Sequence, residues 1–222
     1  MASLRKLSSL SQLVPRDIFV GTSLILRQEG RFLYGLRPAR REGDRFILEL
    51  TGIGGGLEME DASISAGVVR EAREEMGCDV RLIPCQTTLV VRGPQDIEWV
   101  SFEAGERPAV VVFRRYRTPP HQPWHSENKG EACLIVFAAE LQGEPRPAME
   151  LPHLIWLAPE QVLETGQDDV PLARLLEQGA LLVGEKAQPL PPESWARLTD
   201  SQEALVLALG QDARAFYLSL TT

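Results

Sequence analysis

The sequence of 222 residues has few cysteines, few histidines and few aromatic residues, and positive charge is not in excess. Its three cysteines are odd in number and form no short-spaced cluster, which favours reduced core thiols in a cytoplasmic protein over disulfides or a zinc site. The net charge of −8 argues against a nucleic acid or an anionic membrane as a partner. No apolar run reaches the roughly 18 residues that indicate a membrane span. The composition, with 44% hydrophobic and 24% charged residues, is that of an ordinary soluble globular protein.

The first sixteen residues form a segment with two interpretations. They contain three basic residues and no acid, and leucines recur at every third position. This composition is typical of an organelle transit peptide. A short N-terminal helix or arm that packs its leucines on the body of the protein, or on a second subunit, explains the pattern equally well, and we favour this second interpretation. The leucines are Leu4, Leu7, Leu10 and Leu13.

The stretch from Gly54 to Cys78 combines a glycine-rich loop with an amphipathic helix. Three consecutive glycines suit a loop whose backbone approaches another group closely. A helix is predicted after them, because apolar residues recur at helical spacing and Gly77 suits its C-terminal end. Asp61 or Ser63 can cap its start. The apolar positions are Ile64, Val68, Val69, Ala72 and Met76.

Three carboxylates lie on the other side of this predicted helix. Glu71, Glu74 and Glu75 fall within roughly a quarter to a third of the helix circumference, and they repel one another unless a cation neutralises them. Hard divalent ions such as Mg²⁺ or Mn²⁺ bind such oxygen ligands and leave positions for substrate phosphates. Taken alone, the pattern is more typical of a solvated acidic face compensated by Arg70 and Arg73. The glycine loop at the helix entrance favours the metal site.

This stretch resembles the Nudix box, written Gly-x5-Glu-x7-Arg-Glu-U-x-Glu-Glu-x-Gly-U with U a bulky apolar residue. Residues 70–78 match its second half closely, with Ala72 and Cys78 small for the U positions. The first half departs from the pattern. Counting forward from Gly55 places Asp61 where the family has glutamate, whereas counting back from Arg70 places Ala62 there. The departure puts the peripheral metal ligand in doubt and leaves the three helical glutamates intact.

The resemblance implies roles for the residues of the box. Glu74 and Glu75 would bind Mg²⁺, or Mn²⁺, together with the main-chain carbonyl of Gly55. Glu71 would bind metal or act as the base on a water molecule, and Arg70 would hold Glu71 in place. Asp61 would stand in for the missing first glutamate. Relatives often recruit a further carboxylate from a later loop, for which the candidates are Glu127 and Glu131.

Substrate selection is expected outside the box. Arginines at positions 37, 40, 41 and 92 could pair with phosphates, although for any one of them a solvated surface position is the better expectation. We select Arg37 and Arg40, together with Glu127, as substrate-binding candidates. Trp124 lies in a predicted loop and could stack on a base, whereas Trp99 lies in a predicted strand and is expected in the core.

The predicted order of elements is strands, the carboxylate helix, further strands and then helices, which indicates a mixed sheet packed between helices. This agrees with the α/β/α sandwich that the resemblance implies, and a C-terminal helical extension is added to it. We expect an N-terminal arm over 1–16, a Nudix hydrolase domain over 17–187 and an extension over 188–222. Strands are predicted over 18–26, 31–37, 46–50, 79–92, 97–102, 109–116, 131–141 and 154–157, and helices over 159–165, 171–178 and 201–220.

The leading interpretation is a metal-dependent pyrophosphohydrolase. Its substrate would be a small phosphorylated molecule, either a nucleoside diphosphate linked to another group or a nucleoside triphosphate. The altered first half of the box leaves open a nucleotide-binding regulatory module with weak or no turnover. An isoprenoid diphosphate isomerase is disfavoured, because nothing singles out the cysteine and glutamate pair which that chemistry needs. The family often forms dimers, and the N-terminal leucines and C-terminal helix are the candidate contacts.

Overall fold

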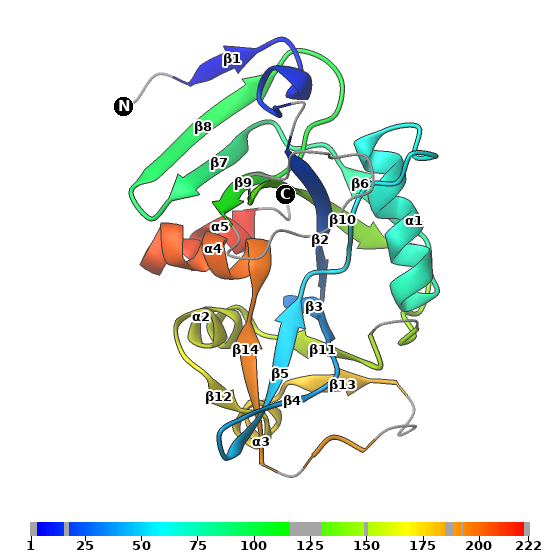
Figure 1. Ribbon diagram of the computed structural model, residues 1–222, viewed down its shortest axis with the longest axis vertical. Helices are drawn as coiled ribbons and strands as arrows, with labels where there is room; N and C mark the ends of the chain where they lie inside the picture. Colours follow the sequence, from blue (N-terminus) through cyan, green and yellow to red (C-terminus); the bar gives the residue numbers. More distant parts are fainter. Residues whose placement is uncertain are drawn as a thin grey trace.

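The computed structural model describes residues 4–15, 18–115, 130–148, 151–184, 189–191 and 193–219. In this part of the chain the strands join one mixed sheet, with helix α1 on one face and helices α2, α4 and α5 on the other (Figure 1). The predicted α/β/α sandwich with a mixed sheet is therefore confirmed. No helix among these residues is long and apolar enough to cross a membrane.

The sheet follows the order β1-β8-β7-β9-β10-β2-β3-β5-β14-β12, and four further strands pair beside this path. The strands are β1 (Arg5–Leu7), β2 (Phe19–Gln28), β3 (Arg31–Leu36), β4 (Arg40–Glu42), β5 (Arg45–Thr51), β6 (Val80–Ile83), β7 (Thr88–Gly93), β8 (Asp96–Phe102), β9 (Val110–Arg115), β10 (Glu131–Leu141), β11 (His153–Leu157), β12 (Val170–Pro171), β13 (Leu181–Val183) and β14 (Ser194–Leu198). The helices are α1 (Ile64–Met76), α2 (Pro159–Gln167), α3 (Leu172–Glu177), α4 (Asp200–Leu209) and α5 (Ala213–Ser219), with 3-10 turns at Leu10–Gln12 and Gly210–Asp212.

Alternation along the central strands divides the core into two layers. On β10, Leu134 and Val136 face one layer, while Cys133 and Ile135 face the other. The first layer lies under α2, α4 and α5, and the second lies under α1. A strand that is buried on both faces reads as a continuous apolar run, which is why 131–141 was recognisable from the sequence.

Within the described residues 4–15, the N-terminal segment forms a short strand and a 3-10 turn and contains no α-helix. Strand β1 pairs in parallel with β8, and Leu7, Leu10 and Leu13 are buried in the α1 layer of the core, whereas Leu4 is exposed. The packing of these leucines on the body of the protein agrees with the arm interpretation.

Three local expectations were wrong. The stretch 79–92 is two strands, β6 and β7, because the chain turns at Pro84 and the two strands pair with different partners. The predicted loop after β3 contains β4, which forms a hairpin with β5. Trp99 is 42% exposed and is not a core residue, and its ring centroid lies 6.1 Å from that of Phe216.

The C-terminal segment extends the sheet before it becomes helical. Strand β14 pairs in parallel with β5 from Ser194 opposite Phe46 to Leu198 opposite Leu50. The two strands therefore end side by side, and the backbone N–H of Thr199 donates to the carbonyl of Leu50 at 3.0 Å. Because β5 continues into the glycine loop and β14 continues into α4, this pairing brings the start of α4 to the glycine loop.

Candidate active site

Helix α1 is fixed at both ends by caps that the sequence indicated. The hydroxyl of Ser63 accepts the backbone N–H of Ala66 at 3.0 Å, and Gly77 adopts the left-handed conformation with φ of 60°. Val68, Ala72 and Met76 are fully buried against the sheet. This fixes the rotation of the helix and turns its carboxylates toward the glycine loop.

The glycine loop lies against β2, and two of its glycines have no room for a side chain. The backbone N–H of Thr22 donates to the carbonyl of Gly55 at 2.7 Å. Gly54 has φ of 148°, and a Cβ atom there would collide with the carbonyl of Thr22. A Cβ atom on Gly55 would lie 2.5 Å from a carboxylate oxygen of Glu71. The predicted close approach of this backbone is therefore made to β2 and to Glu71.

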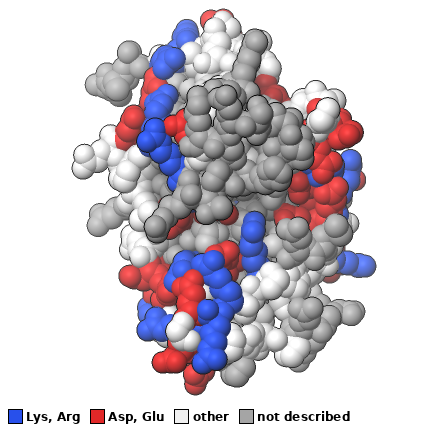
Figure 2. Space-filling model, in the orientation of Figure 1, with Lys and Arg blue, Asp and Glu red and all other residues white. Residues whose placement is uncertain are grey.

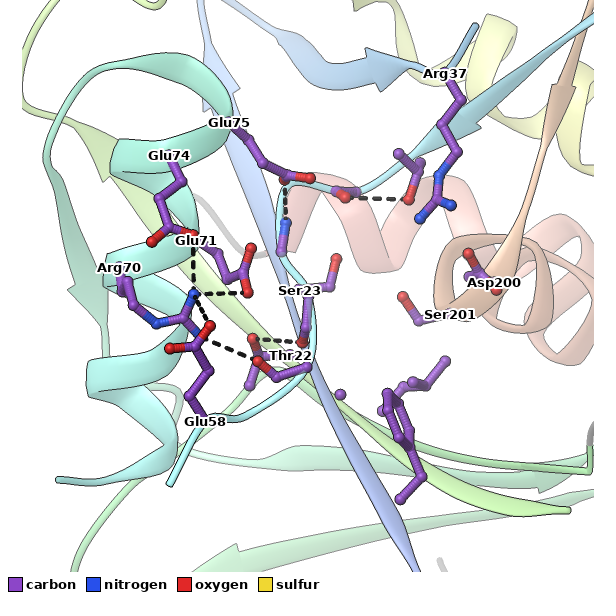
Figure 3. A pocket seen from close by; sticks show the side chains of 18 residues that line it. Thr22, Ser23, Arg37, Glu58, Arg70, Glu71, Glu74, Glu75, Asp200 and Ser201 are labelled. Carbon is purple, nitrogen blue, oxygen red and sulfur yellow. Dashed lines mark hydrogen bonds and ion pairs between the residues drawn. The ribbon is translucent and has the colours of Figure 1, made fainter. Parts of the chain in front are cut away.

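Arg70 is the centre of the carboxylate cluster. Its guanidinium donates to both carboxylate oxygens of Asp61 at 3.1 Å, to Glu71 at 3.0 Å and to Glu74 at 2.9 Å. It also donates to the carbonyl of Gly56 at 3.1 Å. One cation thus connects the glycine loop to the acidic face of the helix, as Figure 3 shows.

Burial and ion pairing act in opposite directions on these carboxylates. Burial raises the pKa of Glu71, and the neighbouring Arg70 opposes that rise. The hydrogen bonds from Arg70 lower the pKa of Asp61, and those same bonds raise the pKa of Arg70. Figure 2 shows acidic side chains gathered over the region of α1, on the right of the view.

The fourth carboxylate of the cluster, Glu75, is held by the loop itself. Its side chain is buried and accepts the backbone N–H of Gly54 at 2.8 Å. The carbonyl of Gly55, expected to bind metal, accepts both the N–H of Thr22 and its hydroxyl at 3.2 Å. Asp61, which was expected to replace the first glutamate of the box, accepts hydrogen bonds from Arg70 with both carboxylate oxygens.

The carboxylates open onto a cavity of about 530 Å³ between α1 and the start of α4. Glu71, Glu74 and Glu75 lie on one side of it, and Arg37, Asp200 and Ser201 lie across from them (Figure 3). Strand β2 supplies the wall between them. The lining comprises Phe19, Gly21, Thr22, Ser23, Arg37, Thr51, Gly52, Gly54, Gly55, Gly56, Glu58, Arg70, Glu71, Glu74, Glu75, Leu134, Asp200 and Ser201.

The other substrate-binding candidates do not meet at this cavity. Arg40 is bound to Glu42 and Glu49, each at 2.8 Å, away from the lining residues. Arg92 pairs with Glu98, and the candidate carboxylate Glu131 pairs with Arg115. Trp124 and Glu127 lie outside the described residues. Of this group, Arg37 alone lines the cavity, and no carboxylate within the described ranges pairs with its guanidinium.

Sequence reasoning missed the part of the site that comes from β2 and from the C-terminal segment. Ser23 falls in the strand predicted over 18–26 and Ser201 begins the helix predicted over 201–220, whereas no role was predicted for Asp200. No local signal identifies them, since they reach the cavity only through the pairing of β14 with β5.

The donors at the cavity suit a hard divalent cation, because they are carboxylate oxygens that repel one another without a counter-charge. Arg70 supplies that counter-charge to Glu71 and Glu74 in this structure. Accordingly, the described residues include no group of three acidic, histidine or cysteine side chains already arranged around a single metal position. The carboxylate oxygens are therefore chemically suited to a divalent cation, and in this structure the guanidinium of Arg70 neutralises two of them.

The fold is an α/β/α sandwich, and its cavity is lined on one side by the carboxylates of α1. Residues 19–178 match the family model for the NUDIX domain, which covers well over half of the chain. The chain therefore belongs to the Nudix family, as its box predicted. The match ends before β13, so β14, α4 and α5 lie beyond the part that it covers.

Three solved structures that are similar to this chain have low sequence identity to it. The E. coli ORF135 protein is 20% identical over 67% of this chain and 79% of its own, with a TM-score of 0.39. A MutT protein from Bacillus halodurans is 21% identical over 66% and 72%, with a TM-score of 0.38. An ADP-ribose pyrophosphatase from Streptococcus suis is 16% identical over 82% and 98%, also with a TM-score of 0.38. No curated protein matches the chain.

Proposed function

We propose that the protein is a divalent-metal-dependent pyrophosphohydrolase. Its substrate would be a nucleoside diphosphate linked to another group, or a nucleoside triphosphate. The observation that carries the proposal is the cluster in which Arg70 holds Glu71 and Glu74 beside the buried Glu75, at the edge of one cavity. Such a concentration of carboxylates costs stability and has a use where a cation and phosphates must be bound together.

Glu74 and Glu75 would hold Mg²⁺ or Mn²⁺, with Glu71 beside them. Gly55 would join these ligands once the hydroxyl of Thr22 turns away from its carbonyl. When bound, the ion neutralises the negative charge of the substrate phosphates and of the leaving group.

The chain's own residues position the reaction. Arg70 fixes the carboxylate of Glu71 at 3.0 Å, so that this side chain keeps one orientation toward the cavity. Glu71, whose carboxylate lies against Gly55, accepts the proton of the attacking water. Arg37, exposed at the opposite side, pairs with a phosphate of the substrate.

A nucleotide-binding module without turnover is the second candidate. The observation in its favour is that the groups expected to bind metal already have hydrogen-bond partners. Arg70 donates to Glu71 and Glu74, and the hydroxyl of Thr22 donates to the carbonyl of Gly55. Binding of a nucleotide with no release of product would support this candidate.

The test is product release from nucleoside triphosphates, ADP-ribose, dinucleoside polyphosphates and nucleotide sugars, with and without Mg²⁺. The variant Glu74→Gln/Glu75→Gln is compared with Glu177→Gln, which alters an exposed carboxylate on α3 outside the cavity. We expect metal-dependent turnover of one substrate class that the double variant loses and Glu177→Gln retains. Equal activity of the double variant and the wild type would refute the assignment.

A further inference from the structure

Two buried side-chain polar atoms in the described part of the chain lack a hydrogen-bond partner. They are the hydroxyl oxygen of Ser23 and the amide nitrogen of Gln202. Ser23 is 7% exposed and Gln202 is 1% exposed. A buried donor without an acceptor costs free energy, so its presence in a native structure calls for an explanation.

Both atoms lie beside Gly52. A Cβ atom on Gly52 would collide with the hydroxyl of Ser23 and would lie 3.5 Å from the amide nitrogen of Gln202. Ser23 and Gly52 both line the cavity, and Figure 3 shows the side chain of Ser23 directed into it between Glu75 and Ser201. Ser23 and Gly52 thus belong to the wall of the cavity, and the amide nitrogen of Gln202 lies directly behind them.

An apolar platform precedes Ser23 along the same face of β2. Side chains alternate along a strand, so positions 19, 21 and 23 share a face. A Cβ atom on Gly21 would lie 2.8 Å from Leu134 and 3.0 Å from the ring of Phe19, which shows that these two side chains meet over the glycine. Ser23 follows about 7 Å further along the strand. Phe19 and Leu134 thus form an apolar surface on the face of β2 that also carries Ser23.

Gln202 is held rigidly in this position. Its amide oxygen accepts the hydroxyl of Tyr217 at 2.8 Å, and the ring of Tyr217 packs edge-to-face on Phe32 of β3 with 4.8 Å between the ring centroids. Arg114 on β9 donates to the carbonyl of Asp200 at 2.6 Å and to Glu203 at 3.0 Å. The orientation that leaves the amide nitrogen without an acceptor is therefore set by contacts that involve three elements of the fold.

We propose that the segment β14–α4, which lies beyond the family match, completes a binding pocket for the base of the substrate. A nucleobase would lie on Phe19 and Leu134, and one of its carbonyl oxygens would accept hydrogen bonds from Ser23 and Gln202. This inference rests on the proposed function, since it names the part of a nucleotide that this side of the cavity receives.

The chemistry of the pocket selects an uncharged ring with a carbonyl group. A carbonyl oxygen has two lone pairs and accepts both donors at once, whereas a ring nitrogen accepts one. The hydroxyl of Ser23 and the amide of Gln202 carry no charge, so the counter-charge for a substrate phosphate is Arg37, which also lines the cavity, and the two donors suit an uncharged group. Aromatic and apolar floors with a few directed polar groups are the usual composition of pockets for planar ligands.

The test measures binding of nucleoside 5′-monophosphates by calorimetry without metal, so that it does not depend on hydrolysis. Ribose 5-phosphate, which has no base, is the reference ligand. The variants are Ser23→Ala and Gln202→Glu, and the second keeps the acceptor for Tyr217 while it removes the donor. Thr88→Val is the control, because the hydroxyl of Thr88 is buried and bonded to the carbonyl of Pro108 at 2.6 Å.

We expect at least one of the monophosphates of uridine, guanosine and inosine to bind more tightly than ribose 5-phosphate. Ser23→Ala should weaken that binding about tenfold, the effect of one lost hydrogen bond to a directed acceptor. The same variant should keep or raise the melting temperature, since it removes an unpartnered hydroxyl, whereas Thr88→Val should lower it and bind normally. Base-dependent binding that is unchanged in Ser23→Ala and Gln202→Glu, or no preference over ribose 5-phosphate, would overturn the pocket. Such a result would not affect the hydrolase assignment, which the product-release assay tests separately.

Discussion

Replacement of Arg70 by glutamine should destabilise the protein strongly at neutral pH. The change removes hydrogen bonds to three carboxylates, of which Asp61 has 8% and Glu71 has 14% of its side chain exposed. Removing one partner of a fully buried ion pair costs about 3–5 kcal/mol. Because Arg70 is 22% exposed and Glu74 is 44% exposed, solvent compensates part of this loss, and we expect about 2–3 kcal/mol.

The loss should depend on pH with a defined sign. The bonds from Arg70 hold the pKa of Asp61 below its ordinary value in the folded state. Their contribution is therefore complete above the pKa of Asp61 in the unfolded chain, about 4, and is lost as the pH falls through the folded value. The gap in stability between the wild type and Arg70→Gln should be widest at pH 7 and should narrow below pH 4.

Thermal unfolding followed by circular dichroism between pH 3 and pH 8 measures this gap. For a chain of this size, 2–3 kcal/mol corresponds to a fall of about 4–12 °C in melting temperature. Arg73→Gln is the matched control on the same helix, because its pair with Asp79 is exposed on both sides and should contribute at most about 1 kcal/mol. A melting temperature for Arg70→Gln equal to that of Arg73→Gln, or a gap that does not change with pH, would refute the reasoning.

Two further changes have definite expected outcomes. Gly54→Ala forces a side chain into the carbonyl of Thr22 at a positive φ, and it should cost about 2–4 kcal/mol in urea unfolding, whereas Gly93→Ala, which meets no atom within 4 Å, should cost under about 1 kcal/mol. Arg197→Gln breaks paired hydrogen bonds to Asp169 at 2.6 and 2.8 Å and should cost about 1 kcal/mol at pH 7. Arg197 lowers the pKa of Asp169, so this difference should disappear in acid, and a difference that persists at pH 3 would contradict it.

The carboxylate helix could be predicted because its signals are local. The spacing of Val68, Ala72 and Met76 gives the buried face, and Ser63 and Gly77 mark the ends within one residue. Fixed residue types at fixed spacing then identified the family. In the altered first half of the box, Asp61 accepts hydrogen bonds from Arg70 with both of its carboxylate oxygens.

The opposite side of the cavity could not be predicted because it depends on contacts between distant segments. Gln202 reaches Ser23 only because β14 pairs with β5, which is about 150 residues earlier in the chain. The exposure of Trp99 could not be predicted either, because β-propensity does not indicate which face of a strand other elements cover. Local patterns therefore predicted the carboxylate helix, and long-range pairing determined what faces it.

Binding of Mn²⁺ to the protein, followed by electron paramagnetic resonance, tests the central claim most directly. The claim is that the carboxylates at the end of the glycine loop form a divalent-cation site. We expect the wild type and Glu177→Gln to take up Mn²⁺ in competition with Mg²⁺, and Glu74→Gln/Glu75→Gln to lose this uptake while it retains the fold. Equal uptake by the double variant and the wild type would contradict the account, because the cation would then be held elsewhere.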